Sequence, residues 1–319
     1  MVVLRTGPVT VGGVTLDNHL LLAAGILGTT GASLARMLAR GAGGVVTKSI
    51  GPQPKDGHAG PCVALLDCGI LNAMGLPNPS REFTGELSLL ENKPVIVSIF
   101  GGNPEEFAEV AGWFKGKAAG LELNLSCPHA EGYGAAVGVD PALVEECTRA
   151  VCALGMPTWV KLTPNVTDIT AIGKAAERGG ASAIVAINTV KAMRISTGLR
   201  RPLLGNRYGG LSGEAIFPVA VRCVYELYEA CSIPIIGCGG VASADNVIEM
   251  MMAGACAVEI GSAVRHDIAI FETIKNDLYA KKGIDPQEII GCAHGCPAAG
   301  AGDPHRDKER DALSKDVLF

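Results

Sequence analysis

The sequence predicts a (β/α)8 TIM barrel, an α/β fold in which eight parallel strands close into a cylinder inside a ring of helices. Three observations predict it. Short apolar segments rich in Val and Ile recur eight times, amphipathic segments separate most of them, and polar residues follow the apolar segments. The 319 residues exceed the ~250 of a typical barrel of this kind. A doubly wound open sheet is the alternative, because periodicity does not show whether a sheet closes.

The eight apolar segments are expected to form buried parallel strands, because each is short, continuous and bounded by Gly or Pro. They are residues 20–24, 44–49, 95–100, 121–127, 158–163, 183–189, 233–239 and 257–262. The amphipathic segments place apolar residues at three- and four-residue spacing, which indicates helices. They are residues 33–40, 104–114, 141–154, 167–178, 214–231 and 243–253. Several begin with a capping residue or a proline, as at Asn103-Pro104, Asp140-Pro141 and Ser243.

The residues beyond these repeats form three insertions and a tail. Residues 9–15 alternate around Gly12-Gly13, which predicts a β-hairpin that closes the bottom of the barrel. Residues 50–93 follow the second strand and residues 190–212 follow the sixth. Both are expected to be long loops on the face where barrels carry their active sites. We expect one domain over residues 1–298 and a polar C-terminal tail over residues 299–319.

Composition and charge exclude several classes of protein. With 48% hydrophobic residues and a net charge of −5, the chain is not expected to be disordered. The 32 Asp and Glu residues outnumber the 27 Lys and Arg residues, so no nucleic-acid partner is expected. No apolar run approaches the ~20 residues of a membrane span, and residues 1–8 lack the pattern of a signal peptide. We expect a soluble, cytoplasmic protein with no membrane partner.

The 11 cysteines indicate neither a disulfide framework nor a metal site. Their number is odd, they are scattered, and no CxxC pair occurs. The spacing of Cys292-Ala-His-Gly-Cys296 matches no familiar zinc or iron–sulfur pattern, so no metal is expected there. Most other cysteines lie in apolar segments and are expected to be small core residues. Cys127, at the end of the fourth strand, is the exception.

Polar residues end six of the eight predicted strands, where a buried strand has no packing use for them. Any one of them could be a helix cap or a turn residue, but six at one barrel mouth indicate a site. They are Thr47-Lys48-Ser49, the segment from Asn124 to Cys127, the segment from Lys161 to Asn165, Asn188-Thr189, Gly239-Gly240 and Gly261-Ser262.

The residue types at this mouth suggest the chemistry of the site. Gly239-Gly240 and Gly261-Ser262 each precede a helix, so their backbone N–H groups are suited to a phosphate. Lys48 and Lys161 need anionic partners in an apolar mouth, and a phosphorylated, electron-rich cofactor with an acidic substrate would supply them. Three amide side chains are suited to a flat, amide-bearing ring, and the Cys127 thiolate could act as a nucleophile or as a base. The amides are Asn72, Asn124 and Asn188.

Six motifs, in the right order, resemble dihydroorotate dehydrogenase of class 1, and the resemblance runs from about residue 2 to about residue 285. They are Asn124-Leu-Ser-Cys127-Pro, Asn72-Ala-Met-Gly-Leu76, Thr47-Lys-Ser, Val160-Lys-Leu-Thr-Pro-Asn165, Ala186-Ile-Asn-Thr189 and Gly209-Gly-Leu-Ser-Gly213. The cysteine of the first motif is typical of class 1, since class 2 enzymes carry serine there and an N-terminal membrane helix. The segments that begin at Val160 and Asn188 are most similar to the class 1B catalytic subunit.

This resemblance implies a flavin mononucleotide (FMN) enzyme that oxidises (S)-dihydroorotate to orotate in pyrimidine biosynthesis. Cys127 would be the general base that takes the proton from C5, while C6 gives hydride to flavin N5. Lys48 would contact both flavin and substrate, and Lys161 would stabilise negative charge near flavin N1. The residues implied to line the flavin are Ala24, Lys48, Ser49, Ser98, Asn124, Lys161, Ile187, Gly213, Gly239, Gly240, Gly261 and Ser262. Those implied to hold the substrate are Lys48, Asn72, Ala73, Met74, Gly75, Leu76, Asn124, Asn188 and Thr189.

The resemblance also implies partners and shows departures. Class 1 enzymes are generally homodimers, and class 1B subunits pair with a second subunit whose FAD and iron–sulfur cluster pass electrons to NAD. This chain has no dinucleotide fingerprint or cluster-ligand run of its own. Ser98 stands where the family often has Asn, Ala24 stands where it often has Ser, and the loop 57–62 lacks the usual Arg. The segment from Cys292 to Cys296 matches no part of the family's pattern.

Two other functions compete with this interpretation. The flavin domain of dihydropyrimidine dehydrogenase, which acts on uracil or thymine, shares the Asn124-to-His129 motif and a stretch like residues 134–138. Lys48 and the loop 72–76 fit a carboxylated substrate better. A non-catalytic flavin-binding subunit is the second alternative, and it would have no use for Cys127 beside two lysines.

Overall fold

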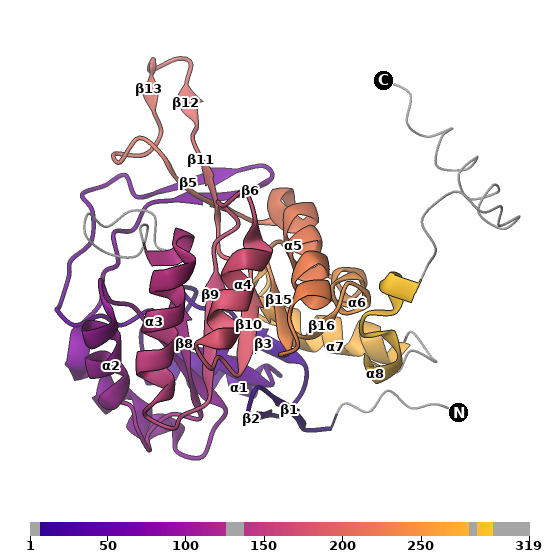
Figure 1. Ribbon diagram of the computed structural model, residues 1–319. Coiled ribbons are helices and arrows are strands. Elements are labelled where there is room, and N and C mark those ends of the chain that lie inside the picture. Colours follow the sequence, from indigo (N-terminus) through magenta and orange to yellow (C-terminus); the bar gives the residue numbers. More distant parts are fainter. Residues whose placement is uncertain (1–6, 126–136, 281–285, 296–319) are drawn as a thin grey trace, which may run out of the picture.

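The computed structural model describes residues 7–125, 137–280 and 286–295, and these residues form a closed barrel of eight parallel strands (Figure 1). Its closure excludes the open sheet and confirms the predicted (β/α)8 architecture. Around the cylinder the strand order is β10-β15-β16-β3-β4-β7-β8-β9. In chain order the strands are β3 (Leu20–Leu22), β4 (Gly44–Val46), β7 (Val95–Ile99), β8 (Gly120–Asn124), β9 (Thr158–Leu162), β10 (Ala183–Ala186), β15 (Ile235–Cys238) and β16 (Ala255–Ile260).

The six predicted helices are confirmed, and most begin at a capping side chain. Asn103 accepts from the N–H of Glu106 and Asp140 accepts from that of Ala142, and a proline follows each cap. Ser243 likewise accepts from the N–H of Asn246. The helices are α1 (Gly31–Ala39), α2 (Pro104–Gly112), α3 (Pro141–Cys152), α4 (Ile169–Arg178), α5 (Phe217–Ala230) and α6 (Ala244–Met252), followed by α7 (Ile270–Ala280) and the short α8 (Pro286–Ile289).

Alternation along each strand separates two cores. On β8, Leu121 and Leu123 belong to the larger apolar cluster that the strands share with the helices. Glu122 and Asn124 alternate with them and therefore point into the barrel. On the neighbouring β9, Trp159 and Lys161 pair with Glu122 and Asn124 and point inward as well. Polar and charged side chains thus enter the barrel interior on two adjacent strands.

An N-terminal hairpin closes the bottom of the barrel, as predicted. Its strands are β1 (Val9–Val11) and β2 (Val14–Leu16), and they pair antiparallel. Their buried side chains share the interior apolar cluster with Trp159. The Trp159 Nε1–H donates to the carbonyl of Gly12 at 3.3 Å. The interior is therefore sealed at the amino ends of the strands, and a ligand reaches it from the carboxyl ends.

The two insertions predicted as long loops lie where expected but are not simple loops. They contribute β5 (Val63–Leu66) and β6 (Gly69–Asn72) from the first insertion, and β11 (Val190–Ala192) and β14 (Gly209–Ser212) from the second. These four strands form one antiparallel sheet in the order β11-β14-β6-β5. We call it the composite sheet. The first insertion also holds a 3-10 segment, Ser80–Leu90.

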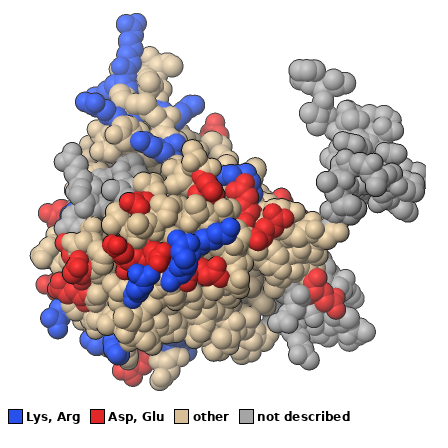
Figure 2. Space-filling model, viewed as in Figure 1, with Lys and Arg blue, Asp and Glu red and all other residues tan. Residues whose placement is uncertain are grey.

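A two-stranded ribbon projects from the second insertion. It consists of β12 (Ile195–Ser196) and β13 (Arg201–Pro202), which pair antiparallel. Figure 1 shows it at the top of the molecule, and Figure 2 shows Lys and Arg side chains gathered on this projection. Its exposed residues include Arg194, Arg200 and Leu199, the last with 64% of its surface exposed.

The C-terminal segment packs against the helices, away from the barrel mouth. The His294 ring stacks on Tyr225 with ring centroids 3.7 Å apart, and its nitrogens contact Glu229 Oε1 and the Ala253 carbonyl. Within the described ranges, no three His, Cys, Asp or Glu side chains gather as metal ligands. Cys296 and the predicted tail 299–319 lie outside the described residues. No helix in the described part of the chain is long and apolar enough to span a membrane.

Candidate active site

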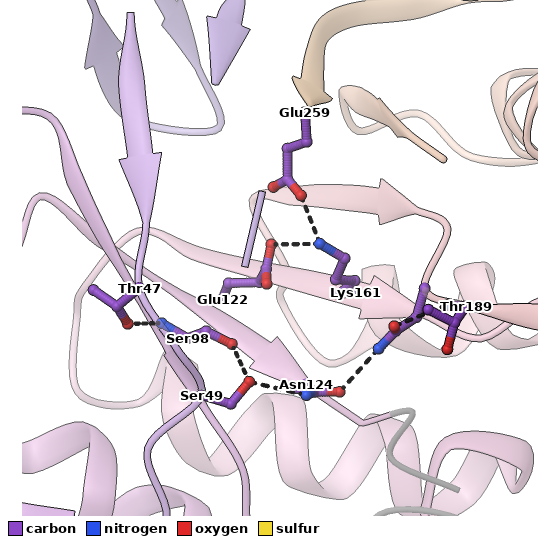
Figure 3. A network of polar contacts seen from close by, with 9 residues as sticks. Thr47, Ser49, Ser98, Glu122, Asn124, Lys161, Thr189 and Glu259 are labelled. Carbon is purple, nitrogen blue, oxygen red and sulfur yellow. Dashed lines mark hydrogen bonds and ion pairs between the residues drawn. The ribbon is translucent and has the colours of Figure 1, made fainter. Parts of the chain in front are cut away.

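A chain of hydrogen bonds crosses the barrel mouth and joins residues from β4, β7, β8 and β10 (Figure 3). The Ser98 N–H donates to Thr47 Oγ1 at 3.1 Å, and the hydroxyls of Ser98 and Ser49 lie 2.9 Å apart. Asn124 Nδ2 donates to Ser49 Oγ at 3.0 Å. Ser49, Ser98 and Asn124, which are predicted separately, therefore lie together in one hydrogen-bonded network. The Ser98 hydroxyl, at the position where the family often has Asn, is the partner of Ser49.

The same chain continues to the residues predicted to hold the substrate. Asn188 Nδ2 donates to Asn124 Oδ1 at 3.3 Å, and the Thr189 N–H donates to Asn188 Oδ1 at 2.8 Å. Asn165 Nδ2 then donates to the Thr189 carbonyl at 3.1 Å. Amide side chains held in fixed orientations can form specific hydrogen bonds with a flat ring that carries both donors and acceptors.

The composite sheet brings Asn72 to this mouth from a different part of the chain. Asn72 Nδ2 donates to the Gly210 carbonyl at 3.3 Å, across 138 residues of sequence. On the other side of Gly210, a Cβ atom would lie 2.1 Å from Thr189 Oγ1, so only glycine allows this approach. Asn72 and Thr189, both predicted to hold the substrate, therefore each lie close to the backbone of Gly210.

The loop after Asn72 presents mainly its backbone and Met74. Ala73 and Leu76 are buried, whereas Met74 is 39% exposed. The Ala73 N–H donates to the Cys62 carbonyl at 2.8 Å, and the Met74 carbonyl accepts from the His58 N–H at 2.9 Å. Gly75 takes a positive φ of 78°. The segment 57–62 thus fixes the shape of this loop.

Glycines gather where β15 and β16 end. Gly239 and Gly240 have φ values of 127° and 76°, and a Cβ atom on Gly240 would lie 2.7 Å from Phe217 Cβ and 2.9 Å from the Gly213 carbonyl oxygen. Within the described chain, no acceptor is found for the backbone N–H groups of Gly240 and Ser262. Gly261 precedes Ser262 at the end of β16. Close backbone approach with unused N–H groups is typical of a phosphate site.

Three other predicted residues follow barrel strands at the mouth. Lys48 follows β4 and is half-buried, and its N–H donates to the Gly28 carbonyl at 2.8 Å. Ala24 follows β3 and is half-buried. The Ile187 side chain is buried in the outer apolar cluster, so this residue can face a ligand only through its backbone. Cys127, the predicted base, lies outside the described residues.

Lys161 has carboxylate partners within the chain itself, which corrects the expectation that a cofactor and a substrate supply them. Its Nζ lies 2.6 Å from Glu259 Oε2 on β16 and 3.7 Å from Glu122 Oε2 on β8. The three side chains are almost completely buried inside the barrel. Figure 3 shows Lys161 pointing between the two carboxyl groups. We call these three residues and the nearby Cys238 the Lys161 cluster.

The protonation states in the Lys161 cluster follow from burial and mutual charge. Burial and then the Glu259 carboxylate raise the pKa of Glu122 well above its ordinary value. Burial lowers the pKa of Lys161, but the surrounding acidic groups Cys238, Glu122 and Glu259 outweigh it, so the net change is a raised pKa. Burial raises the pKa of Cys238 to about 12. These shifts favour the ammonium form of Lys161, the protonated form of Glu122 and the neutral thiol of Cys238.

Replacing Glu122 with glutamine is expected to stabilise the protein more at pH 7 than at pH 5. The folded state keeps the Glu122 proton while the unfolded chain releases it, so the stability of the wild type falls as pH rises. The loss amounts to about 1 kcal/mol per pH unit for one such group, and glutamine removes it. The free energy of unfolding in urea, measured at both pH values, tests this. Glu146→Gln, on the exposed face of α3, is the control. An equal effect of Glu122→Gln at both pH values contradicts a protonated Glu122.

Glu122 and Glu259 are not among the residues predicted from the sequence, although the sequence holds a signal for both. Each is a lone acidic residue inside one of the predicted apolar strands. A carboxyl group buried in an apolar strand needs a partner. Lys161 is a basic residue on another predicted strand, and its side chain points into the barrel as Glu122 does. Local pattern does not show that β9 and β16 face each other across the barrel.

Comparison with known proteins agrees with this geometry. The family model described as "Dihydroorotate dehydrogenase" matches residues 8–281. The chain is 59% identical to a protein of Methanosarcina acetivorans named "Dihydroorotate dehydrogenase B (NAD(+)), catalytic subunit", over 88% of this chain and 94% of that one. Proteins of the same name from Methanocella arvoryzae and Pyrococcus horikoshii are 57% and 48% identical, over 89% and 88% of this chain and 96% and 95% of theirs.

A solved structure supports the fold. It is the dihydroorotate dehydrogenase of Eimeria tenella in complex with ferulenol, which matches with a TM-score of 0.77 at 21% identity. The match covers 90% of this chain and 88% of the other. At this identity the likeness concerns the barrel alone, whereas the family model and the archaeal relatives concern the sequence. The chain belongs to the dihydroorotate dehydrogenase family, as the motifs predict, and to its class 1B catalytic subunits.

Proposed function

We propose that this chain oxidises (S)-dihydroorotate to orotate in pyrimidine biosynthesis, with FMN bound at the barrel mouth of one domain over residues 1–298. The observation that carries the proposal is that the glycines after β15 and β16 and the amide chain that ends at Thr189 lie at the mouth of one barrel, with the Lys161 cluster buried inside it. A flavin nucleotide and a flat substrate need a phosphate-binding site, a positive charge near the flavin ring and hydrogen-bonding groups for the substrate ring.

The residues present fit FMN. Gly240 and Ser262 offer for its phosphate N–H groups that have no acceptor among the described residues, beside the backbone of Gly213 and Gly261. The polar chain through Ser49, Ser98 and Asn124 offers donors and acceptors for the polar edge of its ring. Lys161 offers a fixed positive charge for a ring that becomes electron-rich. When bound, FMN supplies the acceptor for the hydride that leaves C6 of the substrate.

The chain's own residues orient the substrate and move one proton. Asn72, Asn124, Asn188 and Thr189 bind the substrate ring, and Lys48 binds its carboxylate. Cys127 takes the proton from C5, which leaves the electrons of that C–H bond to form the double bond of orotate as hydride departs from C6. The composite sheet pairs Asn72 with Gly210, and Gly210 in turn lies beside Thr189.

The electrons leave through a partner. The archaeal relatives are named as NAD(+)-dependent catalytic subunits, which implies a second subunit. We propose that it carries FAD and an iron–sulfur cluster, and that the catalytic chain forms a homodimer. Co-purification of the tagged chain from its own cells, followed by light scattering, tests both. The predicted cytoplasmic location stays a prediction that cell fractionation can test.

An anaerobic titration tests the proposed function. The purified chain is expected to carry a yellow flavin whose visible absorbance bleaches when dihydroorotate is added. Bleaching by dihydrouracil instead would favour the dihydropyrimidine dehydrogenase alternative. A chain that binds FMN but bleaches with neither substrate would favour the non-catalytic subunit. A chain that binds no FMN after reconstitution contradicts the proposal.

Replacing Gly240 with alanine is expected to weaken FMN binding at least tenfold. Its added Cβ would lie 2.7 Å from Phe217 Cβ and 2.8 Å from the Phe217 nitrogen, so the proposed phosphate cradle must move. Gly116→Ala is a matched control, because Gly116 has a similar φ of 74° but nothing within 4 Å of its Cβ position. Both variants are expected to lose ~1–2 kcal/mol of stability through backbone strain. Fluorescence titration with FMN separates them, and equal Kd values for the two variants contradict the cradle.

A further inference from the structure

Two buried carboxyl groups face one buried ammonium in the Lys161 cluster, and their distances from it differ. Glu259 Oε2 makes a short hydrogen-bonded ion pair with Lys161 Nζ at 2.6 Å, whereas Glu122 Oε2 lies 3.7 Å away. Both glutamates have no exposed surface. One ammonium group balances the charge of only one carboxylate, and a second buried negative charge would stand uncompensated. The geometry therefore divides the two glutamates into different roles.

Among the described residues, the charged and acidic groups of this balance come from a few strands inside the barrel. The groups whose electrostatic effect raises the pKa of Lys161 are Glu122 on β8, Cys238 on β15 and Glu259 on β16. The charged groups that shift the pKa of Glu122 are Glu259, which raises it, and Lys161, which lowers it. In the described part of the chain, both carboxyl oxygens of Glu122 and Oε1 of Glu259 have no hydrogen-bond partner. Only the ion pair between Lys161 and Glu259 is satisfied by a direct hydrogen bond.

We propose that Glu259 is the positioning residue of Lys161 and balances its charge, whereas Glu122 stays protonated and neutral. This inference rests on the proposed function, because it gives the Lys161 ammonium a task at a flavin. The ion pair with Glu259 offsets the positive charge of Lys161, so the cluster does not favour electrons on the flavin as strongly as a bare ammonium does. Glu259 thereby sets how strongly Lys161 favours the reduced cofactor.

Removing the charge of Glu259 is expected to favour the reduced flavin. In Glu259→Gln the ammonium is no longer balanced, so the ratio of the affinities for reduced and oxidised FMN is expected to rise at least tenfold. For a two-electron couple this corresponds to a rise of about 30 mV in the midpoint potential. Glu122→Gln replaces one neutral group with another of the same shape and is expected to leave the potential within a third of that shift.

The experiment measures the midpoint potential of the FMN-loaded chain against reference dyes, for the wild type and both variants. A rise in Glu259→Gln with none in Glu122→Gln supports the proposal. Equal shifts in the two variants, or no shift in Glu259→Gln, overturn it. If Glu259→Gln does not fold, Glu259→Asp takes its place, because it keeps the charge but withdraws the carboxylate by one methylene. A smaller rise is then expected, and an unchanged potential contradicts the positioning role.

Failure of the proposed function and failure of the role of Glu259 give different results. A wild-type chain that holds no FMN removes the proposed function and this inference with it. A wild-type chain that holds FMN and bleaches with dihydroorotate, but whose potential is insensitive to Glu259, overturns the inference alone. A structural role for Glu259 would lower stability without moving the potential, and unfolding in urea measured on the same samples separates the two.

Discussion

Replacing Cys127 with alanine is expected to slow flavin reduction by dihydroorotate by a factor of about 10² to 10⁴, the usual contribution of a positioned general base. Alanine removes the group that takes the C5 proton and leaves the residues proposed to hold FMN in place. The variant is therefore expected to be purified with its flavin bound. The measurement is the anaerobic rate of bleaching in a stopped-flow instrument, with the FMN content determined from the same sample.

Cys152→Ala provides the control for this experiment. Cys152 ends α3, and its thiol donates to the Gly180 carbonyl. Its loss is expected to leave both FMN content and bleaching rate unchanged. Bleaching at the wild-type rate in Cys127→Ala contradicts the role of Cys127 as base. Loss of the flavin itself in that variant would instead assign the cysteine segment to cofactor binding.

Replacing Lys161 with alanine is expected to have two large effects. It leaves the Glu259 carboxylate buried without its partner, and removal of one member of a buried ion pair costs ~3–5 kcal/mol of stability. It also removes the positive charge proposed to favour electrons on the ring, so flavin reduction is expected to slow or FMN binding to weaken. Urea unfolding measures the first effect, and anaerobic bleaching with FMN titration measures the second.

A double variant separates these two effects. Lys161→Met with Glu259→Gln removes both charges, and it is expected to recover most of the lost stability but not the rate of flavin reduction. Lys174→Ala, on the exposed face of α4, is the control for the loss of a lysine. A Lys161→Ala protein with full colour, full rate and wild-type stability contradicts both roles of Lys161.

The barrel itself could be predicted because its signals are local. Each strand is a short apolar run, and each begins and ends within a few residues of its predicted bounds. The hairpin at Gly12-Gly13 is also local, since a tight turn is encoded by the residues that form it. The network from Ser49 to Thr189 could be predicted for a related reason. Parallel strands in a barrel bring their carboxyl ends to one mouth, so residues that follow different strands meet there.

The composite sheet could not be predicted in the same way. Its pairing of β6 with β14 joins Asn72 and Gly210, which are 138 residues apart, and β14 contains Gly209 and Gly210, which weaken any strand signal. β5 is short and half-exposed, so its pattern resembles that of a loop. Local patterns indicate where an insertion lies, but they do not indicate what it pairs with.

The partners of Lys161 show a second limit. The sequence predicts an anionic partner for this lysine, and the prediction assigns that partner to ligands because Glu259 lies 98 residues away along the chain. The physical requirement was correct, but the source of the charge was wrong. A lone carboxyl group in an apolar strand indicates a partner elsewhere in the sequence, because a buried carboxylate without one is costly. Glu122 and Glu259 are both such groups.

The composite sheet has a consequence for anyone who recombines this barrel with another. Its two halves come from insertions on different barrel strands, so they form a single exchangeable part rather than two. Transplanting either half alone would leave an unpaired strand edge exposed on the recipient, which invites intermolecular pairing. Chimeras should therefore carry residues 50–93 and 190–212 together. Directed changes of substrate preference are best screened in libraries that vary both segments at once.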